Sequence, residues 1–171
     1  NALAALTLPN VSDTIAPTVE KVSIYDSGWN PIETPSPDSR IKLAGKFRIV
    51  VRAFDRMDGN PERRKLGIYR LGYQLFYESG LPASDLKWTI EFDRMPPNEA
   101  VRFVYANGSV SGPTGETIFD YIVTNRLTKD SIREDFIDAS MLEPGNYAVR
   151  VFAADLFGNN TTRDIDFEVT R

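Results

Sequence analysis

The sequence contains neither cysteine nor histidine, and these two absences narrow what the chain can do. Without cysteine there are no disulfide bonds and no thiol nucleophile. Without histidine the chain lacks the commonest general base and metal ligand, so every Ser-His-Asp arrangement is excluded. An enzyme built on carboxylates, lysine or tyrosine is the class that stays open. We therefore expect a chain without catalytic activity and without a cofactor.

Long apolar runs and a strong net charge are also missing. The net charge is −4 over 171 residues, so no overall basic field attracts nucleic acid or anionic lipid. The longest apolar candidate, ALAAL at residues 2–6, is far shorter than the roughly 18 residues that a membrane helix needs. We expect neither nucleic-acid binding nor membrane insertion, and a chain long enough for one hydrophobic core.

The first residues predict a linker to another part of a longer protein. The chain begins with Asn1 rather than methionine, which indicates processing or excision from a longer protein, and a remnant of an export signal is the alternative. Two prolines and several turn residues in PNVSDTIAPT favour a linker. We expect residues 1–18 to be a linker or the tail of a preceding domain, and residues 19–171 to form one domain.

Short stretches of alternating apolar and polar residues follow one another along that domain. Residues 46–55 and 147–154 alternate most clearly, and this period of two is typical of strands buried on one face. Further strands are expected at 19–25, 68–77, 86–93, 101–105, 118–123, 136–141 and 163–169. Loops are expected at 26–40 and 107–116, and one helical turn within 127–135. This pattern predicts an all-β antiparallel sandwich of about seven to nine strands, of immunoglobulin-like or fibronectin type III-like form.

One phrase occurs twice, at an offset of 100 residues. Residues 45–60 read GKFRIVVRAFDRMDGN and residues 145–159 read GNYAVRVFAADLFGN, so that Asp55 matches Asp155. The segment LEPGNYAVRVFA resembles the corner of fibronectin type III and immunoglobulin-like domains, where a tyrosine hydroxyl bonds back to nearby backbone. Tyr147 would be that tyrosine. The resemblance implies that the two phrases are the second and sixth strands, in opposite sheets, with both "D…GN" loops at one pole.

These loops have two interpretations. In the first, each Asp accepts hydrogen bonds from loop N–H groups, while Gly59 and Gly158 supply the positive φ of a tight turn. In the second, the loops share a calcium site, because Ca²⁺ takes oxygen ligands. Its candidate ligands are Asp55, Asp58, Asn60, Asp155 and Asn159. The sequence favours the turn interpretation, because Phe157 would be an unusual neighbour for a hydrated ion.

Two groups of side chains are candidates for binding. A basic cluster follows the first loop and could meet an anionic polymer or an acidic partner, although a solvated loop is favoured. It comprises Arg56, Arg63, Arg64, Lys65 and Arg70. Trp29 stands in a proline-rich loop and could stack on a sugar, whereas Trp88 belongs to an alternating apolar face and is expected in the core.

The order of these features resembles a known family. DTIAPTVEKVSIY is followed by VRAFDRMDGN…KLGIYRLGYQLFYESG, then IEFDRMPP, then LEPGNYAVRVFAADLFGNNTTRDIDFEV. This order resembles the immunoglobulin-like accessory region after the catalytic domain in some bacterial lysostaphin-like zinc metallopeptidases. The resemblance covers most of residues 13–170 and is strongest at 46–78 and 142–169. The family's zinc-binding His-x-x-x-Asp and His-x-His patterns have no counterpart here, so the resemblance implies a non-catalytic part.

Three functions remain open. The first is a non-catalytic module of an exported bacterial envelope protein, in the periplasm, on the cell surface or secreted. It would position or restrain a neighbouring peptidoglycan-cleaving domain of the same polypeptide, or bind peptidoglycan or another envelope protein. The second is an adhesin-type or carbohydrate-binding module that acts through its pole loops. The third is a hydrolase based on carboxylates.

Overall fold

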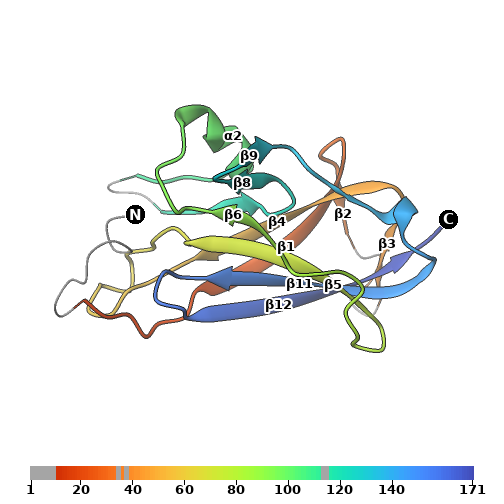
Figure 1. Ribbon diagram of the computed structural model, residues 1–171, viewed down its shortest axis with the longest axis horizontal. Coiled ribbons are helices and arrows are strands. Elements are labelled where there is room, and N and C mark those ends of the chain that lie inside the picture. The colour runs from red at the N-terminus through yellow and green to blue at the C-terminus, as the bar shows by residue number, and fades with distance from the viewer. Residues whose placement is uncertain (1–10, 34–35, 37–38, 113–115) are drawn as a thin grey trace.

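The computed structural model describes residues 11–33, 36, 39–112 and 116–171, which form two β-sheets packed face to face (Figure 1). Residues 1–10 of the predicted linker, and parts of the loops predicted at 26–40 and 107–116, lie outside the described residues. The all-β sandwich that the alternating pattern predicts is therefore confirmed.

The first sheet is built on β4, which pairs with β1 along one edge and with both β10 and β7 along the other. β1 and β4 are antiparallel, so that Thr18 lies opposite Phe54 at one end of the pair. The strands of this sheet are β1 (Thr18–Asp26), β2 (Pro31–Ile32), β4 (Lys46–Phe54), β7 (Asp120–Ile122) and β10 (Ile137–Asp138).

The second sheet has the order β3-β12-β11-β5-β6-β8-β9. Its strands are β3 (Ile41–Leu43), β5 (Arg70–Tyr77), β6 (Lys87–Glu91), β8 (Arg126–Thr128), β9 (Ser131–Arg133), β11 (Gly145–Ala154) and β12 (Asn160–Val169). β3 runs parallel to β12, and β6 runs parallel to β8. The strand pairs of this sheet are otherwise antiparallel, so these two parallel pairs are local exceptions in the predicted antiparallel sandwich. The described residues form twelve strands, more than predicted, because six of them have only two or three residues.

The core lies between β4 and β11, which belong to opposite sheets, as the resemblance to immunoglobulin-like domains implies. Ile49, Val51 and Ala53 of β4 are almost fully buried, and Val149, Val151 and Ala153 of β11 are equally buried. Each fully buried valine or isoleucine contributes about 1.5–3 kcal/mol relative to an exposed one. The alternation of the two phrases thus builds the centre of the sandwich.

Arg48 departs from the alternating pattern. The sequence places it on the outer face of β4, yet the residue is only 4% exposed. Its guanidinium lies 4.5 Å from the ring centre of Trp29 and 4.3 Å from that of Phe136. The loop that carries Trp29 and the segment that carries Phe136 therefore cover this face of the strand.

Two local predictions were wrong. Residues 101–105 form no strand, because a 3-10 turn (η1, Asn98–Ala100) continues into a short helix (α2, Val101–Val104). Ala100 and Val104 are buried at helical spacing, whereas Val101 is exposed. Residues 127–135 contain the β8–β9 hairpin rather than a helical turn, since Leu127 alternates into the core. A second 3-10 turn, η2 (Ala139–Met141), precedes β11.

Tyr147 makes the hydrogen bond that the sequence predicts for it. Its hydroxyl donates to the main-chain carbonyl of Glu143 over 2.9 Å, and its ring stacks on Phe167 with 5.6 Å between ring centres. The residue is 5% exposed. This corner fixes the start of β11, and hence the position of the loop at its far end.

Candidate functional site at the N-terminal pole

Three aspartates converge at the end of the sandwich where β1 begins and where β4 and β11 end. Asp13 precedes β1, Asp55 follows β4 and Asp155 follows β11. Each offers one carboxylate oxygen, and these oxygens lie within 4.8 Å of one another. We call this end, with residues 11–17 (the N-terminal segment) and the loops 55–66 and 155–159, the N-terminal pole. Figure 1 shows these loops together at the left end of the sandwich.

All three carboxylates are withdrawn from water. Asp13 is 9% exposed, Asp55 7% and Asp155 4%. No ion pair among the described residues involves any of them. Buried aspartates are normally paired with a cation or coordinate a metal, because the charge is costly to desolvate alone. The three carboxylates are therefore brought together without a positive side chain ion-paired to any of them in the described part of the chain.

The loop after β11 follows the turn interpretation. Asp155 Oδ1 accepts a hydrogen bond from the N–H of Asn159 over 2.8 Å, and its Oδ2 accepts one from Asn159 Nδ2 over 2.7 Å. The N–H of Asp155 donates to the carbonyl of Asn159 over 3.1 Å, and Gly158 has a φ of 97°. Turn chemistry accounts for both carboxylate oxygens of this aspartate.

In the loop after β4 the spacing from the aspartate to the asparagine of the GN pair is one residue longer, and this loop does not close in the same way. Its Gly59 has the predicted positive φ of 79°, but Asn60 bonds through its N–H to the carbonyl of Met57 over 3.0 Å. Asp55 pairs through its main chain with Leu66. Its Oδ1 is buried and has no hydrogen-bond partner. Turn chemistry therefore leaves one oxygen of Asp55 unexplained.

The environment of Asp55 opposes its ionisation. Burial raises the pKa of its carboxyl to about 6, and the carboxylates of Asp155 and Asp13 raise it as well. The N–H of Arg56 donates to the same carboxyl and lowers its pKa in part. Desolvation and like charge thus act together at this one group.

The N-terminal segment is attached to both loops. Asn159 Nδ2 donates to the carbonyl of Asp13 over 2.9 Å. The N–H and Oγ1 of Thr14 donate to Asp58 Oδ2 over 3.1 and 3.2 Å. Asp13 Oδ1 accepts the N–H of Ile15 over 3.0 Å. The described part of the predicted linker, residues 11–17, is therefore held against the domain.

The sequence predicted five candidate calcium ligands at this pole but did not include Asp13, which lies beside Asp55 and Asp155. Asp55 and Asp155 are brought together, while Asp58 is engaged by Thr14 and Asn159 by Asp155 and Asp13. Asp13 was assigned to the linker. Its position could have been inferred from the order of the strands. If β1 pairs antiparallel with β4, the residues before β1 lie beside those after β4.

An apolar pocket of about 370 Å³ adjoins the three carboxylates. Its walls include Met57, Leu66, Ile68, Tyr69, Phe92, Tyr105, Leu156 and Phe157. Phe157, which the sequence analysis took as an argument against a hydrated ion, does line the same pocket as the carboxylates. Such walls lower the local dielectric and strengthen every charge interaction within the pole.

The predicted basic cluster does not converge on one site. Arg63 and Arg64 are exposed on the loop after β4. Lys65 pairs with Glu20 over 3.2 Å and lies 4.4 Å from the ring centre of Phe54, which Arg56 also approaches. Arg70 instead stacks on Trp88, which is half-buried and also contacts Phe152 edge-on.

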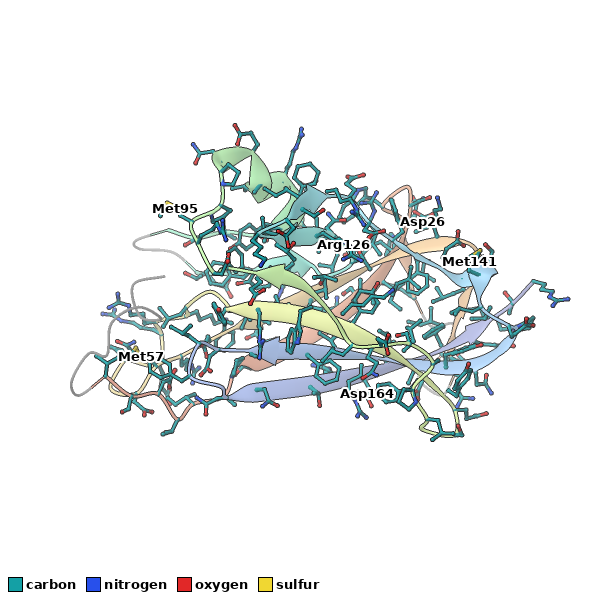
Figure 2. All side chains as sticks on the ribbon, viewed as in Figure 1. Asp26, Met57, Met95, Arg126, Met141 and Asp164 are labelled. Carbon is teal, nitrogen blue, oxygen red and sulfur yellow. The ribbon has the colours of Figure 1, made fainter. Side chains whose placement is uncertain are left out.

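Trp29 lies at the opposite end from the carboxylates. Figure 2 labels Met57, in the loop after β4, at the left end of the molecule, and Asp26, near Trp29 in the chain, in its upper right part. Trp29 has a φ of 67°, held by a loop in which Asp26 Oδ1 accepts the N–H groups of Gly28 and Asn30. Its side chain is 40% exposed. Trp29 and the carboxylates therefore belong to separate sites.

Fold and site together define an all-β sandwich with a cluster of buried carboxylates at the end where β1 begins. Comparison of the chain with protein-family models, with curated protein sequences and with solved structures finds no match. Within the described residues, no helix combines the length and apolar character needed to cross a bilayer.

Proposed function

We propose that this chain is a non-catalytic β-sandwich module of an exported bacterial cell-envelope protein, and that it holds a neighbouring domain in a fixed direction. One observation carries the positioning role. The N-terminal segment is tied to loops that are distant in sequence: Thr14 bonds to Asp58, 44 residues away, and Asp13 to Asn159, 146 residues away.

A flexible linker would leave these groups in water. Ordering the backbone costs about 1–2 kcal/mol per residue, so contacts of this kind are needed to keep such a segment in place. Domains joined by unconstrained linkers move relative to one another by default. A segment anchored at two points instead holds Asp13 and Thr14 in one place relative to the sandwich, and this fixed point supports the positioning role.

The envelope setting rests on the resemblance to the accessory region of lysostaphin-like zinc metallopeptidases. The hydrogen bond from Tyr147 to Glu143 supports the immunoglobulin-like or fibronectin type III-like part of that assignment. The absence of histidine supports a non-catalytic role. Purified chain incubated with peptidoglycan and zinc should release no fragments, and release that follows the chain through purification would contradict this.

The positioning role can be tested by pulsed electron paramagnetic resonance, because a chain without cysteine accepts spin labels only where cysteines are introduced. Ser12→Cys labels the N-terminal segment, and Asp166→Cys labels an exposed position on β12. Asp166 lies about 23 Å along β12 from Asn159, at ~3.3 Å per residue, which is a measurable separation. We expect one narrow distribution of distances.

Removing the two anchors should broaden that distribution. In the combined variant Asp58→Ala with Asn159→Ala, residues 11–17 lose their bonds to both loops. Asn160→Ala is the matched control. Asn160 is next to Asn159 in the chain, and its side-chain amide makes only a 3.4 Å contact with the carbonyl of Gly158. A broad distribution in the unaltered chain, or one equally narrow in the combined variant, would contradict the positioning role.

Carbohydrate binding is a second candidate, favoured by the setting of Trp29. This exposed indole borders a cavity of about 540 Å³ that is also lined by Arg102, Asn107 and Glu134. An aromatic face beside convergent polar groups suits a sugar. Soluble peptidoglycan fragments should then change the tryptophan fluorescence, and Trp29→Ala but not Trp88→Phe should abolish the change. No change in the unaltered chain would exclude this function.

A further inference from the structure

The three carboxylates of the N-terminal pole have the spacing of ligands to one ion. Their nearest oxygens lie within 4.8 Å of one another. Two oxygens that bind the same Ca²⁺ at about 2.3–2.6 Å can be at most about 5 Å apart. A single ion between Asp13, Asp55 and Asp155 can therefore contact all three, with only small movements of the side chains.

A second observation points to a missing partner. Asp55 is 93% buried, and its Oδ1 accepts no hydrogen bond. Its neighbours in the cluster, Asp13 and Asp155, are also acids. A buried carboxylate oxygen without a donor or a cation is costly, and the repulsion of two neighbouring carboxylates adds to that cost. An ion at the centre of the cluster would provide the partner and offset the like charge.

The donor set selects the kind of ion. The candidate ligands are carboxylate oxygens, and the chain has no histidine or cysteine with which to favour zinc or copper. Mg²⁺ demands near-ideal octahedral geometry and retains several waters. The apolar walls formed by Leu66, Phe92 and Leu156 leave little polar surface to hold such waters. Ca²⁺ accepts irregular geometry and can take both oxygens of a carboxylate.

We propose that Asp13, Asp55 and Asp155 bind one Ca²⁺ ion at the N-terminal pole. The three ligands come from three separate parts of the chain, so the ion joins the N-terminal segment to the loop after β4 and the loop after β11. This inference deepens the proposed function. It rests on that function in one respect: the fixed direction of the N-terminal segment, which the positioning role requires, would depend on calcium.

Titration calorimetry on chain freed of metal with EDTA tests the site directly. We expect CaCl₂ to bind with a stoichiometry of one, and MgCl₂ to bind at least tenfold more weakly. Tb³⁺ should occupy the same site and show luminescence sensitised by Tyr69 and Tyr105, which line the adjoining pocket. No heat from CaCl₂ and no sensitised luminescence would overturn the proposal.

Variants locate the ion. Asp55→Asn and Asp13→Asn should each weaken Ca²⁺ binding at least tenfold, and Asp13 lies outside both turns, so its variant should still fold. Asp58→Asn is the matched control, since this exposed acid at the same pole bonds to Thr14 and is not one of the three. Unchanged affinity in Asp13→Asn and Asp55→Asn would overturn the proposal, as would a loss confined to Asp58→Asn.

The failure of this inference can be distinguished from that of the proposed function. If calcium does not bind but the Ser12–Asp166 distances are narrow in EDTA, the site is wrong and the positioning role stands. If calcium binds but the distances are broad with and without it, the site is right and the positioning role is wrong. We expect a narrow distribution in Ca²⁺ that broadens in EDTA.

Discussion

The side chain of Asn159 joins the turn after β11 to Asp13, a residue 146 positions earlier in the chain. Its Nδ2 donates to the carbonyl of Asp13 over 2.9 Å and to Asp155 Oδ2 over 2.7 Å. One amide thus holds the N-terminal segment and the loop after β11 together beside the buried carboxylates.

Asn159→Ala removes both bonds of that amide. A hydrogen bond contributes about 0.5–1.5 kcal/mol net, and those to charged groups more, so we expect a loss of about 1–3 kcal/mol in the free energy of unfolding. Denaturant unfolding measures it. Asn160→Ala, at the next and exposed position, should change stability by less than about 0.5 kcal/mol. Equal effects of the two variants would show that the bridge does not matter.

Tyr147→Phe removes the hydroxyl that donates to Glu143 and retains the ring stacked on Phe167. We expect a loss of about 0.5–1.5 kcal/mol in the free energy of unfolding, the usual net value of one such bond. Tyr77→Phe is the control, because Tyr77 is 48% exposed and contacts the same ring. An unchanged denaturant midpoint in Tyr147→Phe would contradict the role of this corner.

Gly158→Ala tests the turn after β11. A Cβ at this position would meet no atom within 4 Å, so its cost comes from the φ of 97° alone. We expect a loss of about 1 kcal/mol or more in stability. Gly112 is equally open but carries no positive φ, so Gly112→Ala should be neutral or slightly stabilising. Identical thermal melts for the two variants would rule out strain as the role of Gly158.

The pH dependence of stability in EDTA reports the charge of Asp55. Its pKa is raised in the folded state to about 6, from about 3.9 in an unfolded chain. The folded state therefore binds more protons between these values, and this group's contribution to stability falls as pH rises through that window. The facing groups are Asp13, Asp155, the N–H of Arg56 and the hydroxyl of Tyr121.

Asp55→Asn removes that dependence. Without metal, the stability of the variant relative to the unaltered chain should rise between pH 4 and pH 7, by on the order of 2 kcal/mol. Urea unfolding at several pH values measures the difference. Parallel curves for the two proteins would show that Asp55 ionises without penalty in the folded chain.

The sequence predicts the central strands because burial on one face imposes a period of two. β4 and β11 show that period, whereas their place in opposite sheets was implied by the resemblance of the Tyr147 corner to immunoglobulin-like domains. The helix at Val101–Val104 was not predicted, since a four-residue helix is shaped by contacts of Ala100 and Val104 that a local pattern does not contain. The burial of Arg48 likewise depends on Trp29 and Phe136, which are distant in the chain.

The sequence predicted two of the three buried aspartates of the candidate site, Asp55 and Asp155, and missed Asp13. Asp55 and Asp155 stand at matching positions of a repeated phrase, and the resemblance to immunoglobulin-like domains implied that these positions share one pole. Their different partners could not be predicted, because the loop after β4 runs on until Leu66 pairs with the main chain of Asp55, whereas Asp155 bonds to Asn159. Asp13 has no repeat to mark it and reaches the cluster only through the pairing of β1 with β4.

A crystal structure of the chain grown with CaCl₂, with a second crystal grown with Tb³⁺ for its anomalous signal, tests the central claim most directly. We expect one ion at the N-terminal pole, bound by oxygens of Asp13, Asp55 and Asp155 at about 2.3–2.6 Å in the calcium crystal. We also expect residues 11–17 to lie against both loops. Carboxylates that contact only water or one another, with no anomalous peak between them, would contradict the account.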